Sequence, residues 1–258
     1  MLIDSHAHLE LSDFDGDRED VIKRAKENGV ERIVTVGINL EDSRKAVTLA
    51  ERHDNIYASV GVHPHDAKSI NETTYDSLKK LSESDRVVAY GEIGLDFFRN
   101  LSPRDLQIKR FGEQLELAGE LGLPVIIHDR EAHREIVEML KGWKSYSGGV
   151  IHCFSGDYDM AVKCLDMGFY ISIPGTITYR KSETLRDVVR RMPIDRLLVE
   201  TDCPYLSPEP KRGKRNEPAN VVYTARRIAQ IKGLPFEDVA RITSTNTMNV
   251  FGIKAAVL

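Results

Sequence analysis

The chain has 258 residues, of which 29% are charged and 41% hydrophobic, and its formal net charge is −4. This length suits one large α/β domain or two small ones, and the charge excludes a surface coated with cations. No apolar run approaches the ~18 residues of a membrane span, and no secretory signal is visible, so no membrane partner is expected. Three cysteines without CxxC spacing (Cys153, Cys164, Cys203) indicate a reducing, cytoplasmic location.

Short apolar, β-branched runs alternate along the chain with longer segments of helical periodicity. Eight of these runs are predicted strands: 2–4, 32–37, 57–62, 87–94, 124–128, 149–153, 169–173 and 196–202. Predicted helices between them include 17–29, 40–53 and 102–122. For the third helix, Ser102 is the predicted N-cap, Pro103 occupies the first helical position and Gly122 ends the helix.

Eight strand–helix units in about 200 residues predict a (β/α)8 barrel. A doubly wound open sheet is the alternative, but the first predicted strand lacks the glycine-rich phosphate loop that usually follows it in that fold. After the eighth strand come a proline-rich basic loop (207–218) and two helical segments (219–233 and 236–252). We therefore expect one α/β domain over residues 1–258, a distorted TIM barrel with C-terminal helices.

Ionisable side chains gather at the predicted strand ends, where barrel enzymes place their chemistry. Six of the eight histidines lie at or just past a strand end, and His53 and His133 are the exceptions. His6 and His8 are one residue apart at the end of the first strand, so their side chains point the same way. If the barrel forms, six side chains converge at its mouth: His6, His8, Glu92, His128, His152 and Asp202.

This cluster predicts a metal centre, although any one of its histidines alone would more often be structural. Buried carboxylates and imidazoles at this density need compensating charge, which divalent cations supply. Mixed histidine and carboxylate ligands suit Mn²⁺, Zn²⁺ or Ni²⁺ better than Mg²⁺. Glu92, flanked by glycines in YGEIGLD, is the natural carboxylate to bridge two ions. Cys153 and Cys203 each follow a predicted ligand, so strand alternation is expected to turn them away.

Several motifs carry a resemblance to a known family: LIDSHAHLE, GVHPH, GEIGLD, PVIIHDREA, IHCFSG, and LLVETDCPYLSP followed by KRNEP. In this order they resemble the TatD family of metal-dependent hydrolases, within the amidohydrolase-like barrels, from residue 2 to about 251. The resemblance implies a centre of one or two divalent ions (Mg²⁺, Mn²⁺, Zn²⁺ or Ni²⁺). It implies hydrolysis of DNA phosphodiesters, with single strands or 3′ ends as the expected substrate. No obligate protein partner is inferred from the sequence.

The resemblance also assigns the ligands. One ion would be held by His6, His8 and Asp202. The second would be held by His128 and His152, and Glu92 would bridge the two. The chain departs from the family at Glu10, where Asp or Asn is usual, and at Arg134, where an acidic residue is usual. Neither position is a predicted ligand, so only the surroundings of the centre are affected.

Three residues have predicted roles in catalysis around these ions. Asp202 is the predicted general base, with a role as ligand alone as the alternative. Glu200 shares its strand face and is expected to orient a ligand histidine from behind. His63 is predicted to contact substrate or protonate a leaving group, or else to pack beside Pro64.

The basic loop holds Lys211, Arg212, Lys214 and Arg215. It is expected to steer phosphates toward the mouth, with Arg215 and Asn216 as the substrate-binding candidates, and a solvated surface loop is the alternative. Aromatic residues that can stack on bases include Phe98 and Tyr205, although packing at the barrel rim is their expected role.

Three functions remain in competition. The first is a metal-dependent deoxyribonuclease of the 3′–5′ exonuclease type, with Glu92 and Asp202 as catalytic residues. The second is hydrolysis of another bond, such as an amide, a lactone or a D-aminoacyl-tRNA ester. The fifth predicted strand ends without a lysine that could be carbamylated, which favours a glutamate-bridged centre. The third is a non-enzymatic metal-bound scaffold, which the intact ligand set disfavours.

Overall fold

Eight parallel strands form the centre of the protein in a computed structural model that describes residues 1–143 and 148–254. Residues 144–147 and 255–258 of the predicted domain lie outside the described residues. The strands pair in chain order: β1 (Leu2–Ala7), β2 (Val30–Val36), β3 (Ile56–Val60), β4 (Val87–Asp96), β5 (Val125–Arg130), β6 (Gly149–Ile151), β7 (Tyr170–Ile173) and β8 (Leu197–Val199). This is the predicted barrel, with every predicted strand present.

The barrel closes between β1 and β8 through a few contacts instead of a full ladder. Ala7 and Cys203 form an isolated parallel bridge. The backbone N–H of His8 donates to the carbonyl of Cys203 at 2.8 Å, and the N–H of Asp202 donates to the carbonyl of His6 at 2.9 Å. This seam places Asp202 next to His6, at opposite ends of the sequence.

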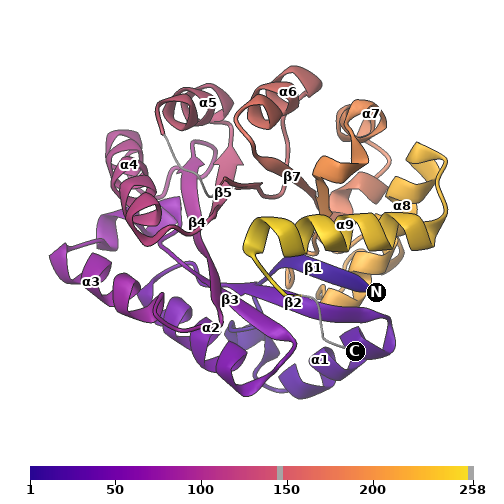
Figure 1. The fold of residues 1–258 in the computed structure, drawn as a ribbon, viewed down its shortest axis with the longest axis horizontal. Helices are drawn as coiled ribbons and strands as arrows, with labels where there is room; N and C mark the ends of the chain where they lie inside the picture. Colours follow the sequence, from indigo (N-terminus) through magenta and orange to yellow (C-terminus); the bar gives the residue numbers. More distant parts are fainter. Residues whose placement is uncertain (144–147, 255–258) are drawn as a thin grey trace.

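Helices surround the strands (Figure 1). They are α1 (Arg18–Glu27), α2 (Leu40–Arg52), α3 (Glu72–Leu81), α4 (Arg104–Leu121), α5 (His133–Gly142), α6 (Tyr158–Asp166), α7 (Glu183–Arg191), α8 (Val221–Lys232) and α9 (Phe236–Phe251). The predicted C-terminal helices are α8 and α9. In the described part of the chain, no helix has the length and apolar character that crossing a membrane requires.

The start of α4 differs from the prediction. The helix begins at Arg104 with Pro103 as its N-cap, so the prediction of Ser102 as N-cap is wrong. The hydroxyl of Ser102 instead donates to the carbonyl of His65 at 2.8 Å. The other end is as predicted, because Gly122 takes a left-handed φ of 66° that favours glycine.

Helix α9 crosses one end of the barrel, where the strands begin (Figure 1). The side-chain amide of Asn246 donates to the carbonyl of Leu197, the first residue of β8, at 2.8 Å. Apolar side chains from β2, β4, β5, β6 and β8, including Val88 and Leu198, form one cluster with Val250 and Phe251 of α9. Apolar packing therefore fills this end, and the opposite end is left for polar residues.

Candidate metal centre

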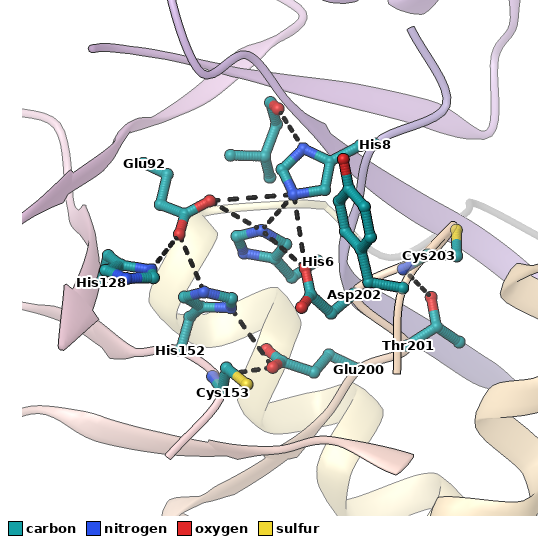
Figure 2. Close-up of polar contacts among 12 residues, drawn as sticks. His6, His8, Glu92, His128, His152, Cys153, Glu200, Thr201, Asp202 and Cys203 are labelled. Carbon is teal, nitrogen blue, oxygen red and sulfur yellow. Dashed lines mark hydrogen bonds and ion pairs between the residues drawn. The ribbon is translucent and has the colours of Figure 1, made fainter. Parts of the chain in front are cut away.

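At the carboxyl ends of the strands lies a cavity of about 890 Å³. Five predicted ligands line it: His8, Glu92, His128, His152 and Asp202. The sixth, His6, is buried, and its ring stacks on that of His152 with centroids 3.8 Å apart. Figure 2 shows the six side chains pointing toward a common space. The structure thus brings together all six residues that the sequence placed at the barrel mouth.

Glu92 lies between two groups of histidines (Figure 2). Its Oε2 is 3.3 Å from Nε2 of His6 and 3.8 Å from Nε2 of His8. Its Oε1 is 2.6 Å from Nδ1 of His128 and 2.9 Å from Nε2 of His152. Because each oxygen faces a different group, Glu92 has the arrangement that a carboxylate shared by two ions requires.

The glycines around Glu92 let β4 approach β5 closely. Gly91 has a φ of 159°, and a Cβ there would lie 2.6 Å from the carbonyl oxygen of Ile126. Gly94 has a φ of 143°, and a Cβ there would overlap the carbonyl of His128. Only glycine fits both positions. The YGEIGLD segment therefore sets Glu92 beside His128 on the neighbouring strand.

Asp202 completes the group on the His6 side. Its Oδ1 lies 3.4 Å from Nε2 of His8 and 3.9 Å from Nε2 of His6. The φ of Asp202 is 55°, a left-handed value that contacts of the adjacent backbone must stabilise. Asp4 does so through Thr201, whose N–H and hydroxyl donate to the Asp4 carboxylate at 2.9 and 2.5 Å.

Two further carboxylates lie beside ring nitrogens of His152 and His128. Oε1 of Glu200 is 3.3 Å from Nδ1 of His152, the kind of contact that its predicted role requires. Oδ2 of Asp96 is 3.4 Å from Nε2 of His128, a partner that the sequence reasoning missed. Such carboxylate–histidine pairs fix which ring nitrogen is free to bind a metal. Strand periodicity could have revealed Asp96, because it lies on β4 four residues after Glu92 and shares its face.

Glu10 belongs to the same outer set of partners. Its Oε1 lies 3.4 Å from Nδ1 of His8, which also contacts the carbonyl oxygen of Val36 at 2.8 Å. The hydroxyl of Thr35 donates to Oε2 of Glu10 at 2.6 Å. The departure from the family pattern at Glu10 therefore falls on a residue that contacts a predicted ligand.

The charges of the cluster suit a cation. Burial raises the pKa of Glu92, but the facing His152 imidazole and the hydrogen bonds from His128 and His152 outweigh burial and hold the pKa well below its usual range. Burial likewise raises the pKa of Asp202, and the hydrogen bond from His8 more than offsets it, so the pKa is lowered. Nε2 of His6 and Nε2 of His8 lie only 3.2 Å apart beside these ionised carboxylates. Convergent nitrogen and carboxylate donors fit one or two divalent ions.

His63 faces Glu92 differently from the other histidines. Its Nε2 is 3.5 Å from Oε1 of Glu92. His63, Glu92 and His128 are therefore close enough to one another to hold a metal ion. However, Nδ1 of His63 accepts the backbone N–H of His65 at 3.1 Å. Burial lowers the pKa of His63 well below the usual value. With Nδ1 accepting the His65 N–H, a neutral His63 ring carries its proton on Nε2, the nitrogen that faces Glu92.

Arg215 and Asn216, predicted to bind substrate, do not line the cavity. Arg215 pairs with Asp17 at 2.7 Å and its guanidinium lies over the ring of Phe14. Asn216 is fully buried, and its amide donates to the carbonyls of Thr201 and Tyr205 at 2.9 and 2.7 Å. These contacts give Asn216 a role in holding the segment that carries Asp202.

The position of Cys153 differs from the expectation that its side chain turns away from the site. Strand β6 ends at Ile151, so strand alternation does not extend to Cys153, which has a φ of 46° and lines the cavity. Its backbone N–H donates to Oε1 of Glu200 at 2.7 Å. The expectation that it turns away is therefore wrong. Cys153, Cys164 and Cys203 are all free thiols.

Comparison with known proteins decides the family. The family model for TatD related DNase matches residues 3–252. The chain belongs to the TatD family. The uncharacterised metal-dependent hydrolase YabD of Bacillus subtilis is 45% identical over 98% of this chain and all of its own length. The 3′-5′ ssDNA/RNA exonuclease TatD of Erwinia amylovora is 39% identical, again over 98% of this chain and all of its own length.

A solved structure agrees with this assignment. The crystal structure of YjjV, a TatD homolog from Escherichia coli, superposes with a TM-score of 0.93 at 32% identity and covers 98% of both chains. The protein is thus a metal-dependent hydrolase of the TatD family with the barrel that the resemblance implied.

Proposed function

We propose that this TatD-family protein is a 3′–5′ exonuclease that hydrolyses phosphodiester bonds of single-stranded DNA. The observation that carries the proposal is the position of Glu92, whose two oxygens face two different groups of histidines. A centre of two ions sharing one carboxylate is a common arrangement for phosphodiester cleavage. The activity for which the Erwinia amylovora relative is named supports the choice of nucleic acid.

In this proposal, His6, His8 and Asp202 would hold one divalent ion, His128 and His152 would hold a second, and Glu92 would be shared by the two. When bound, the ions lower the pKa of water and polarise the phosphoryl oxygen. The histidine ligands point to Mn²⁺, Zn²⁺ or Ni²⁺, with Mg²⁺ as the remaining candidate. All three cysteines are free, which fits the proposed reducing cytoplasm.

Asp202 is the proposed general base. Its Oδ1 faces His8, whereas no hydrogen bond to its Oδ2 occurs among the described residues, so Oδ2 is available for the proton of the attacking water. His63 donates from Nε2 to the substrate, since its Nδ1 is occupied by the His65 N–H. Glu200 and Asp96 hold the rings of His152 and His128 in position during the reaction.

The test begins with chelator-treated protein that is reloaded separately with each of the four metals. Three substrates are offered: a 5′-labelled single-stranded oligonucleotide, a chromogenic phosphodiester and a D-aminoacyl-tRNA. We expect successive shortening of the oligonucleotide from its 3′ end, restored by metal and absent in Glu92→Gln. Hydrolysis of the aminoacyl ester without cleavage of DNA would overturn the proposal in favour of a deacylase.

A further inference from the structure

Two arginines line the cavity wall on the His128 side without an ion-pair partner. Arg99 and Arg130 are both exposed, and neither guanidinium forms an ion pair or a side-chain hydrogen bond with any residue in the described ranges. Their backbones are fixed next to one another. The backbone N–H of Arg99 donates to Oδ1 of Asp96 at 2.7 Å. In the register of β4 and β5, the backbone of Asp96 lies opposite that of Arg130.

Their freedom contrasts with the arginines of the predicted basic loop. Arg215 is bound to Asp17 at 2.7 Å, and Arg212 lies over Tyr179 and 3.4 Å from Glu209. Charge on those side chains is already matched. The guanidiniums of Arg99 and Arg130 instead border a cavity that holds the metal-binding cluster, where a phosphodiester chain would bring negative charge.

An exposed aromatic ring adjoins this pair. Phe98 is 56% exposed, which is unusual for a phenylalanine, and the Arg130 guanidinium lies 4.3 Å from its ring centroid. With the cation against one side, the open part of the ring is available for stacking on a base. Arginine beside an exposed aromatic is a combination that binds single-stranded nucleic acid without reading sequence.

We propose that Arg99, Arg130 and Phe98 form a subsite for the nucleotide next to the cleaved bond, in which the guanidiniums bind a phosphate and the ring stacks on a base. The subsite deepens the proposed nuclease function and rests on it. It lies on the His128 side of Glu92, so it sets how the strand enters the centre and favours single strands, whose bases are free to stack.

Binding is measured first, on chelator-treated protein, so that no cleavage occurs. Fluorescence anisotropy follows a labelled oligothymidylate and a chain of equal length with tetrahydrofuran units in place of nucleosides. Arg99→Ala and Arg130→Ala should each weaken both probes about tenfold, because each loses a charged contact. Each should also make the slope of log affinity against log salt concentration shallower by about 0.7. Phe98→Ala should weaken mainly the base-bearing probe.

Arg241→Ala is the matched control, because this exposed arginine lies on α9 at the opposite end of the barrel and pairs with Asp238. It should change neither affinity nor salt dependence. The double variant that carries both Arg99→Ala and Arg130→Ala is measured beside the wild type and the control. Equal affinities of all three proteins would overturn the subsite. Wild-type protein that binds neither probe would also overturn it.

Turnover with metal restored separates this subsite from the proposed function. The subsite predicts that the arginine variants raise KM for the oligonucleotide far more than KM for the chromogenic phosphodiester. Loss of kcat on both substrates, with KM unchanged, would contradict it. Wild-type protein that binds the probes through Arg99, Arg130 and Phe98 but cleaves no oligonucleotide would refute the nuclease, and with it the place of the subsite next to a cleaved bond.

Discussion

The two ends of the barrel use the same strands for opposite purposes. Where the strands begin, α9 seals the barrel with buried apolar residues such as Leu198 and Phe251. Where the strands end, histidines and carboxylates surround a cavity that packing does not fill. In a TIM barrel this division lets one end supply stability and the other supply chemistry. If it holds here, substitutions at the two ends should separate activity from stability.

The largest expected effect is on activity, from Glu92→Gln. The amide keeps the size of the side chain but removes the charge shared by the two histidine groups, so hydrolysis of the chromogenic phosphodiester should fall roughly a thousandfold. Mass spectrometry of bound metal should show reduced content, and circular dichroism should show the barrel intact. Full turnover in this variant would exclude Glu92 as the bridge.

The reverse pattern is expected for Phe251→Ala at the sealed end. Truncating this buried ring should lower the free energy of unfolding by about 3–5 kcal/mol, because it leaves a cavity against Val250 and the strand residues. Urea unfolding of the metal-free protein measures the loss. The kcat of the protein that remains folded should match wild type. A large fall in kcat at unchanged stability would break the division between the ends.

The sequence predicted more of the apolar scaffold and the ligands than of what surrounds them. Eight β-branched runs were enough to predict the barrel, and histidines at strand ends were enough to predict the cluster. The seam between Ala7 and Cys203 explains why residue 6 and residue 202 meet, as barrel closure requires. Local propensity was less reliable at Ser102, where a tertiary hydrogen bond to His65 replaced the capping role.

The surroundings of the centre depend on contacts that a linear pattern does not contain. A run of cationic residues indicated the basic loop, yet Arg215 has a partner in Asp17, far away in the sequence. Arg99 and Arg130 are isolated in sequence and come together only through the pairing of β4 with β5. Glu10 and His8 likewise meet Thr35 and Val36 of β2 only because β1 and β2 lie side by side.

A smaller effect is expected for Glu200→Gln, which tests how far the functional end extends behind the ligands. Glu200 is buried, contacts Nδ1 of His152 and accepts the N–H of Cys153. Removing its charge should weaken metal binding by 10–100-fold, the usual cost of losing such a partner. Calorimetric titration of the chelated protein with Zn²⁺ measures this. Glu138→Gln, at an exposed residue of α5 paired with Lys141, is the control and should bind metal as wild type does.

The smallest effect concerns His133, which starts α5 just beyond the mouth. The hydrogen bond with Asp129, 2.9 Å from its Nδ1, raises the pKa of His133 above the usual value. The folded state therefore holds this proton more tightly than the unfolded state. The stabilisation is fully present below the unfolded pKa of about 6.5 and is lost as pH rises through the folded pKa.

His133→Gln should consequently lower the free energy of unfolding more at about pH 5 than at about pH 9. The difference should stay below about 1 kcal/mol, since the half-exposed side chain is screened by water. Urea unfolding of both proteins at the two pH values measures it. A deficit that is equal at both pH values would mean that His133 stabilises α5 without its charge. In that case the carboxylate of Asp129 would not contribute to stability through the charge of His133.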